Sequence, residues 1–289
     1  MGVIIIQIRR PLLIILMFVV AISFIITNNT KNDEELNDKI ITIQGVVKGK
    51  IEKKRYNQYK VGVFLINDYT KNKNLKIGQK VNITGKFKSL DKMKYDDFDY
   101  GRYIKSTGYK GIVYINNYKI IDKNKLYSLI GEIKFYISKT YRYLYKKNSD
   151  FINSILLAEV ENLTEEQKEI FTRTGTSHVI SISGLHTGIL CVIISFLLRG
   201  INKLYKLLIL SIFITLYCIM VGASPSIIRS IAFVMIFYLS IFIDRKKDGI
   251  SALSLIGIIL IMNNPYVIYN VSFQLSFLAT LSILIFYNK

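Results

Sequence analysis

Histidine and cysteine are scarce in this 289-residue chain, which narrows the chemistry available to it. The two cysteines, Cys191 and Cys218, lie within apolar runs, so no disulfide framework is visible and each is expected to be a small buried residue. The two histidines, His178 and His186, are eight positions apart, which is about 12 Å along a continuous helix. One zinc ion cannot bind both at that separation unless the segment is bent, so no metal site is expected. No cofactor is expected either.

Catalytic constellations are also missing. Ser183 and His186 are three positions apart and could meet on one helix face, as a Ser–His hydrolase requires. Such a pair needs an orienting carboxylate, and Asp244 and Asp248 are expected on the cytoplasmic side instead. No P-loop is present, so energy would have to come from a partner. The sequence therefore does not predict an enzyme.

Apolar residues are abundant and unevenly distributed. They make up 51% of the chain and concentrate at residues 3–27 and from residue 177 onward. Residues 28–150 are instead rich in Lys, Asn and Tyr, with 27 Lys and Arg against 13 Asp and Glu, which gives +14 of the net charge of +19. A basic domain attracts polyanions such as nucleic acid, anionic lipid or acidic wall polymers, although codon usage in an AT-rich genome produces the same composition. These regions predict a lipid-embedded part and an aqueous part.

The apolar regions predict a membrane protein with several spans. The first follows Arg9 and Arg10, whose side chains are expected to snorkel to one interface, and an uncleaved anchor is favoured over a signal peptide. The span at residues 250–262 is short and is expected to be tilted less, re-entrant or buried against its neighbours. The predicted spans are residues 12–26, 179–198, 204–221, 227–243, 250–262 and 267–287.

Basic residues in the short loops predict the orientation. Three basic groups fall on one side if the spans alternate, whereas the loops around 222–226 and 263–270 contain no Lys or Arg. We therefore expect a multi-pass cell-membrane protein with a cytoplasmic N-terminus and residues 28–176 outside the cytoplasm. The three groups are Arg9 and Arg10; Arg199, Lys203 and Lys206; and Arg245, Lys246 and Lys247.

The aqueous part reads as a small β-barrel. Alternating Val, Ile and Tyr residues with Gly and Asn at the bends predict five short strands, near 41–47, 59–65, 75–87, 111–115 and 118–121. Five such strands suit an OB-like barrel, so the fold class is α+β: a helical membrane bundle with an extracytoplasmic barrel. The predicted domains are an anchor at 1–27, the barrel at 28–122, amphipathic and connecting helices at 123–176, and an incomplete polytopic bundle at 177–289.

Two features of the aqueous part leave alternatives open. Residues 126–147 form a basic amphipathic helix that could lie on the membrane surface or pack on the barrel. A capping box of Thr164 and Gln167 predicts the start of a further helix. Several tyrosines among the lysines could stack bases of a single strand or serve as ordinary core and rim residues. These tyrosines are Tyr56, Tyr59, Tyr69, Tyr95, Tyr100, Tyr103 and Tyr109.

Four stretches in order resemble one family. Residues 172–190 (TRTGTSHVISISGLHTGIL), 222–229 (GASPSIIR) and 264–279 (NPYVIYNVSFQLSFLA) are similar to three signatures of the ComEC-type competence proteins. Residues 98–104 (FDYGRYI), followed by Gly108, resemble the end of that family's extracytoplasmic barrel. The family motif residues carried over are Gly175, His178, Ser181, Gly184, Leu185, Gly222, Ser224, Pro225, Pro265 and Phe273.

The resemblance implies a channel that takes single-stranded DNA into the cytoplasm during natural transformation. Polar side chains within apolar spans are costly unless they face a bundle interior or a water path, so a DNA pathway is hypothesised. Helix–helix packing is the alternative role for the same residues. The candidates for the pathway are Ser183, His186, Arg229 and Gln274.

The implied partners are single-stranded DNA, membrane lipid and a cytoplasmic ATP-driven helicase or translocase. Family members are usually longer, so the chain is expected to be a fragment or a shortened member, and a missing C-terminal half or a homo-oligomer would complete a pore. The rival interpretations are a membrane-tethered polyanion-binding or nucleic-acid-binding module that conducts nothing and, less favoured, a small-solute transporter.

Overall fold

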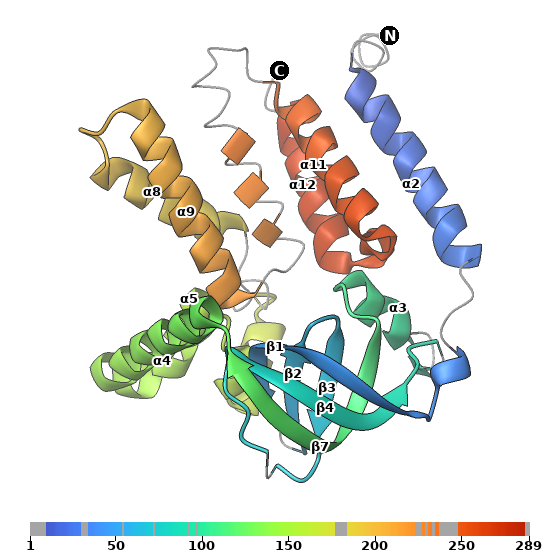
Figure 1. Ribbon diagram of the computed structural model, residues 1–289. Helices are drawn as coiled ribbons and strands as arrows, with labels where there is room; N and C mark the ends of the chain where they lie inside the picture. Colours follow the sequence, from blue (N-terminus) through green and yellow to red (C-terminus); the bar gives the residue numbers. More distant parts are fainter. Residues whose placement is uncertain are drawn as a thin grey trace.

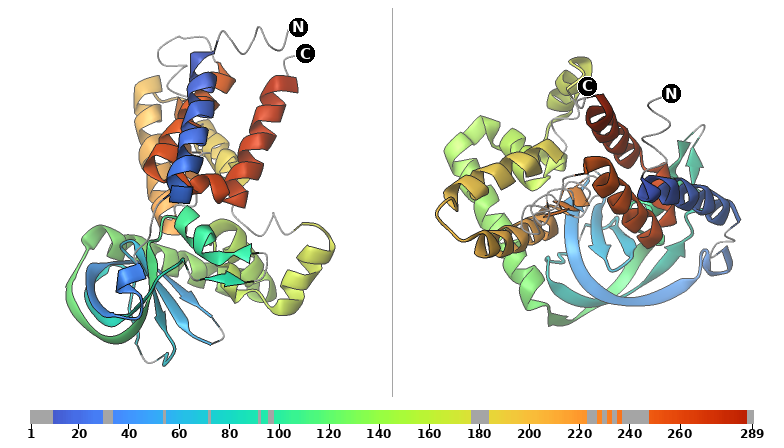
Figure 2. Two further views of the ribbon diagram at one scale, coloured as in Figure 1. Left: turned by 90° about the vertical axis from the view of Figure 1, so that its right-hand side faces the viewer. Right: turned by 90° about the horizontal axis from the view of Figure 1, so that it is seen from above.

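A computed structural model describes most of the chain. The described residues are 10–29, 34–53, 55–71, 73–91, 93–95, 98–176, 184–222, 227–228, 231–232, 235–236 and 248–286. A β-barrel lies at one end of the molecule, and a group of apolar helices stands on one side of it (Figure 1). The side view in Figure 2 shows α3 between the barrel and these helices.

The barrel is closed and has five strands. Its strands follow the order β1-β2-β3-β7-β4, in which β3 and β7 are parallel and the other pairs are antiparallel. This is a five-stranded barrel of the predicted OB-like kind. The strands are β1 (Ile40–Glu52), β2 (Asn57–Val61), β3 (Phe64–Asp68), β4 (Gln79–Lys88) and β7 (Gly111–Lys123), while β5 (Lys94–Tyr95) and β6 (Phe98–Asp99) form a separate small hairpin.

Two predictions about the strands were wrong. The stretch at 59–65 is a hairpin rather than one strand, because Gly62, with φ +57°, turns the chain between β2 and β3. The predicted hairpin at Asn116 and Asn117 is instead part of one long strand, β7. Thr84 pairs with Asn117 and Gly85 with Ile115, so Asn116 is the extra residue of a β-bulge.

Alternation along the strands forms the barrel core. In β4, Val81, Ile83 and Phe87 are buried and point inward, with polar residues between them. Tyr59 and Ile66 of the neighbouring strands are fully buried in the same cluster. The core is therefore an ordinary packed barrel interior, which leaves function to the surface and the connecting segments.

The basic amphipathic helix packs on the barrel. Helix α4 (Lys125–Tyr145) lies so close to Gly78 that a Cβ there would come within 2.4 Å of the Ser128 nitrogen. Gly78 also has φ +90°, which favours glycine. On the outer side of α4, Phe135 and Tyr136 are exposed. The start of α4 therefore packs on the barrel, as one of the two alternatives predicts, and contact of its exposed side with a membrane stays a prediction.

Short helices connect α4 to the apolar helices. The predicted capping box is confirmed: Thr164 accepts a hydrogen bond from the Gln167 nitrogen, and the Gln167 side chain accepts one from the Thr164 nitrogen. The connecting helices are η2 (Lys146–Asn148), α5 (Ser149–Leu157), η3 (Val160–Asn162) and α6 (Glu165–Arg173).

Among the described residues, two apolar helices, α2 and α9, are long enough to cross a membrane, and three others are shorter. The predicted span 227–243 lies largely outside the described residues. The predicted span 267–287 was wrong at its start, because the 3₁₀ turn η4 precedes the helix; Pro265 opens this turn and Asn264 caps it at the Tyr266 nitrogen. The elements are α2 (Pro11–Asn29), α8 (Gly184–Leu197), α9 (Lys203–Val221), α11 (Gly249–Asn263), η4 (Pro265–Tyr269) and α12 (Val271–Phe286).

Helices α2 and α11 run side by side in the same direction (Figures 1 and 2). Arg10, before α2, forms an ion pair of 3.3 Å with Asp248, the N-cap of α11. At the other end the Ser23 hydroxyl donates to the Pro265 carbonyl over 2.8 Å. Between them Leu16 lies against Gly257, where a Cβ would meet its side chain at 2.9 Å. The first helix is therefore fixed at both ends to the last third of the chain.

Candidate nucleic-acid interface

A row of tyrosine rings runs across the barrel surface. The centroids of Tyr56 and Tyr69 are 4.8 Å apart, and those of Tyr69 and Tyr114 are 5.8 Å apart. Tyr56 lies in the β1–β2 loop, Tyr69 directly follows β3, and Tyr114 lies in β7. We call Tyr56, Tyr69 and Tyr114 the tyrosine row. The side chain of Tyr69 is 55% exposed, so its ring is accessible to a partner.

Lysines surround the tyrosine row. Lys53 lies over the Tyr56 ring, with its amine 5.1 Å from the centroid. An open depression of about 380 Å³ is lined by residues close in sequence to Tyr56 and Tyr69, and the side chain of Lys73 in its lining reaches the Asn116 carbonyl. The depression is lined by Lys50, Glu52, Asn57, Lys71, Lys73 and Asn74. Stacking rings beside ammonium groups is the arrangement that binds single strands without sequence preference, and this is the face by which OB folds bind oligonucleotides.

The other tyrosines flagged in the sequence have different surroundings. Tyr59 is fully buried and its hydroxyl donates to the Lys73 carbonyl, so it belongs to the core. Burial raises the pKa of Tyr109 to about 12. Tyr100 and Tyr103 lie on α3 (Tyr100–Ser106), away from the row, and the side chain of Tyr95 lies outside the described residues. The structure thus divides the tyrosines between the two roles.

Two of the family-like stretches meet at the junction of the barrel and the apolar helices. The Asn264 amide donates to the Lys105 carbonyl over 2.8 Å, and the Asn270 amide donates to the Ser106 hydroxyl oxygen over 3.1 Å. Lys105 and Ser106 belong to α3, whereas the two asparagines flank η4. The stretch at 98–104 therefore leads directly into the contact with the stretch at 264–279.

Local sequence explains why α3 takes this position. Asp99 caps the helix by accepting a hydrogen bond of 2.8 Å from the Arg102 nitrogen. Gly101 packs against the barrel, where a Cβ would come within 1.9 Å of the Leu90 carbonyl oxygen. Any larger residue would force α3 away from the barrel. The motif therefore holds α3 in the position where it contacts the residues that flank η4.

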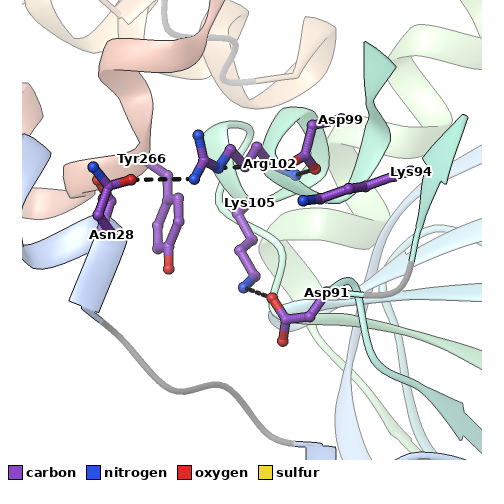
Figure 3. Close-up of a pocket in the computed structure, with 8 residues that line it drawn as sticks. Asn28, Asp91, Lys94, Asp99, Arg102, Lys105 and Tyr266 are labelled. Carbon is purple, nitrogen blue, oxygen red and sulfur yellow. Dashed lines mark hydrogen bonds and ion pairs between the residues drawn. The ribbon is translucent and has the colours of Figure 1, made fainter. Parts of the chain in front are cut away.

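Cations from α3 lie over tyrosine rings of η4. The Arg102 guanidinium carbon is 4.9 Å from the Tyr269 centroid, and the Lys105 amine is 5.1 Å from the Tyr266 centroid. Arg102, Lys105 and Tyr266 border a second, polar pocket of about 210 Å³ (Figure 3). Its lining is Thr27, Asn28, Asp91, Lys94, Asp99, Arg102, Lys105 and Tyr266.

The predicted pathway residues are placed only in part. His186 is half-buried on the first turn of α8, beside the buried Thr187. Gln274 is on α12, where its amide donates to the Ile268 carbonyl over 2.6 Å and so caps η4. Ser183 and Arg229 lie outside the described residues. Their shared role in a pathway stays a prediction.

The remaining motif residues mark helix ends and contacts. Gly175 and Gly222 have φ +67° and +101°, and they follow α6 and α9. Gly184 begins α8. Pro265 accepts the hydrogen bond from Ser23, and Phe273 is buried in a cluster with Leu16. The positions outside the described residues are His178, Ser181, Ser224 and Pro225, together with the side chain of Leu185.

No sequence pattern predicted the second pocket. Lys105 pairs with Asp91 over 2.5 Å across 14 positions, a spacing that no helix or strand period links. Asn28 and Tyr266 join them from the two ends of the chain. As for metals, the described part of the chain brings together no group of three or more His, Cys, Asp or Glu side chains.

Comparison with known proteins agrees with the sequence motifs. Residues 155–289 match the Competence protein family, which confirms the predicted resemblance over that region. The ComE operon protein 3 of Bacillus subtilis (strain 168) is 26% identical over 165 residues, which are 56% of this chain and 21% of that protein. An uncharacterized protein of Aquifex aeolicus (strain VF5) is 30% identical over 125 residues, covering 43% and 30% of the two chains. The match thus spans under a third of either relative.

One solved structure is similar at a low level. The aspartyl tRNA synthetase from Entamoeba histolytica aligns with a TM-score of 0.23 and 13% identity over 60% of this chain and 38% of that chain. So low a score carries no argument about shared fold or function.

Proposed function

We propose that this chain, whose residues 155–289 match the Competence protein family, is a membrane component for the uptake of single-stranded DNA during natural transformation. The barrel binds the strand outside the cytoplasm, and the apolar helices conduct it inward. Since no P-loop is present, a cytoplasmic ATP-driven helicase or translocase supplies the energy. The chain acts without catalysis of its own.

One observation carries the proposal: the tyrosine row beside lysines on the barrel. Base stacking on successive rings and phosphate contacts to ammonium groups together bind a single strand. The barrel that carries the row contacts the apolar helices through α3, which hydrogen-bonds to the residues that flank η4. A strand bound at the row is thus held at a fixed position relative to the helices.

The arrangement of charge supports a multi-pass orientation. The start of α2 and the connection between α8 and α9 lie at the end of the apolar helices away from the barrel (Figure 1). In the sequence, Arg10 directly precedes α2, and Arg199 lies in that connection. Positive residues concentrate on the cytoplasmic side of membrane proteins. The barrel then lies outside the cytoplasm, where incoming DNA arrives.

The rival function is a membrane-tethered module that binds any polyanion and conducts nothing. The same lysines would serve it, but the tyrosine row would not matter, because polyphosphate has no bases to stack. Binding of a short oligothymidylate and of polyphosphate to the full chain in detergent, measured by fluorescence anisotropy in competition, separates the two.

Tyr69→Ala is expected to weaken oligothymidylate binding by between about fivefold and 100-fold and to leave polyphosphate binding unchanged. Tyr69→Phe keeps the ring and should retain DNA binding. Tyr145→Ala, which removes an exposed tyrosine from α4, is the matched control. Equal loss of both ligands, or no loss with Tyr69→Ala, would contradict stacking and favour the polyanion module.

A further inference from the structure

The pocket at the junction has a chemistry that DNA uptake does not explain. It opens between the C-terminal end of α2, the hairpin of β5 and β6, α3 and η4, and has a volume of about 210 Å³ (Figure 3). Its size suits one small polar group, whereas a nucleic-acid strand needs a continuous groove. The occupant therefore has to be identified from the charges and donors around it.

Among the described residues that line the pocket, there is one more cation than anion. Lys105 pairs with Asp91 over 2.5 Å and Arg102 with Asp99 over 3.5 Å, so both carboxylates are already neutralised. The amine of Lys94 forms no ion pair with a carboxylate of the described residues, and in Figure 3 it points toward Arg102 and Lys105. A single negative charge in the pocket would complete the balance.

Donors that the protein itself does not use surround this surplus charge. The Arg102 guanidinium has five N–H groups, and its contacts with Asp99 and Asn28 leave some of them available. The Asn28 oxygen accepts the bond from Arg102 at 3.1 Å, so its two N–H groups remain donors. The hydroxyl of Tyr266 is buried and has no hydrogen-bond partner among the described residues. Such a set of donors fits an oxyanion with further hydroxyl groups.

The position of the pocket selects the source of that oxyanion. Asn28 lies at the C-terminal end of α2, and Tyr266 lies in the turn between two apolar helices. The last turns of α2 expose Phe24, Ile25 and Ile26, as a lipid-facing helix does. Tyrosine and basic side chains beside such a surface are typical of the headgroup layer of a membrane.

We propose that this pocket binds the phosphodiester headgroup of an anionic phospholipid of the phosphatidylglycerol class. Lys94 and Arg102 contact the phosphate, while Asn28 and Tyr266 contact the glycerol hydroxyls. The inference rests on the proposed membrane-embedded function, because it places α2 and η4 at the outer leaflet. It adds a lipid that holds the barrel against the membrane beside the α3–η4 contact.

Native mass spectrometry of the full chain, released from mixed micelles containing equal phosphatidylglycerol and phosphatidylcholine, tests the site. The parental protein should retain phosphatidylglycerol preferentially. Lys94→Glu should lower that retention by at least about fivefold, because it removes one favourable cation and adds a repulsive charge. Lys119→Glu makes the same charge change at an exposed position of β7 outside the pocket and should have no effect.

Two further measurements keep the result decisive. Tyr266→Phe removes only the buried hydroxyl and should lower retention of phosphatidylglycerol while the melting temperature stays at the parental value, which excludes misfolding as the cause. Equal retention of both lipids by the parental protein, or parental retention by Lys94→Glu, would overturn the proposal. The proposal would also be overturned if an oligothymidylate displaced the lipid and bound more weakly to the Lys94→Glu variant, since the pocket would then bind DNA.

The same preparations separate this inference from the proposed function. Oligothymidylate binding at the tyrosine row is measured with Tyr69→Ala, which does not touch the pocket. Loss of lipid selectivity with normal dependence on Tyr69 would overturn the lipid site alone. Lipid selectivity without any effect of Tyr69→Ala would overturn the DNA-binding proposal and leave the lipid site in place.

Discussion

The Asn270 amide donates a hydrogen bond to the Ser106 hydroxyl oxygen, and both side chains are buried although 164 positions separate them. Ser106 ends α3 on the barrel, and Asn270 is the C-cap of η4 between two apolar helices. A buried polar pair with a defined geometry fixes orientation as well as contact. The barrel and the apolar helices are therefore coupled as one unit at this point.

A double-mutant cycle should detect this coupling. Asn270→Ala or Ser106→Ala alone is expected to lower the free energy of unfolding by about 1–3 kcal/mol. Ser106→Ala leaves the buried Asn270 amide without this acceptor, and Asn270→Ala removes this bond and also the acceptor of the Phe273 nitrogen. The double variant should lose less than the sum of the two. Thermal unfolding of the full chain in detergent measures these differences. Additive losses would mean that the two side chains do not interact.

Lys60 is predicted to make stability depend on pH. Burial lowers the pKa of Lys60, and Glu161 raises it to a smaller extent; burial also lowers the pKa of Lys134 on α4. The folded state therefore binds fewer protons than the unfolded state between the lowered pKa and 10.5, so stability should increase as the pH rises through that window. Measurements should stay at least about one pH unit below 10.0, the ordinary pKa of tyrosine, because unfolded tyrosines are half ionised at that pH.

Lys60→Met should stabilise the protein at neutral pH and flatten this profile. Methionine keeps an apolar side chain of similar length over Gly49, where an added Cβ would lie 3.3 Å from the Lys60 Cδ. Lys119→Met, at an exposed position, should leave the profile as it is. Melting temperatures across the pH series provide the comparison, and an unchanged slope in Lys60→Met would refute the assignment.

His186 and Arg229 are predicted to act in DNA passage rather than in DNA binding. In a host where the protein, completed if necessary, supports uptake, His186→Ala or Arg229→Ala should reduce DNA internalisation and leave surface binding intact. Arg229→Lys should recover only part of the loss, because an ammonium group replaces the guanidinium fork. Internalised labelled DNA is compared at equal membrane abundance. Normal import by both alanine variants would favour helix packing as the role of these residues.

The orientation can be tested with reporter fusions. A reporter placed after Asn117, in the bulge of β7, should behave as extracytoplasmic, and one placed after Lys247 as cytoplasmic. The reason is that three short basic loops agree on one orientation in the sequence, and the connection between α8 and α9 lies at the end of the apolar helices opposite the barrel (Figure 1). A truncated fusion ending within α11 is the control for insertion. Cytoplasmic activity at Asn117 would reverse the arrangement.

Local patterns made much of the fold predictable. The alternation of Val81, Ile83 and Phe87 identified β4, and the capping box of Thr164 and Gln167 identified the start of α6. Each of these signals lies within a few positions, where strand and helix periods apply. The family-like stretches also identified the region that matches the Competence protein family.

Features that depend on distant partners were not predictable. The continuity of β7 through Asn116 depends on its pairing with β4, which the sequence of β7 alone does not encode. The junction joins Ser23 to Pro265 across 242 positions, and the pocket joins Asp91 to Lys105 and Tyr266. No periodicity relates such residues, so the second pocket could only be found from the structure.

The pairing of α2 with α11 has a consequence for how the protein is made. The partners of Arg10 and Leu16 lie on α11 and its N-cap. The ribosome must therefore synthesise the barrel and most of the chain before these contacts can form. At the usual rates of translation this interval is on the order of tens of seconds. In the proposed membrane topology, α2 would wait in the bilayer during that time without its final neighbour, with the barrel already on the far side. In that topology the pairing of α2 with α11 is a late event that follows insertion and is timed by the emergence of α11.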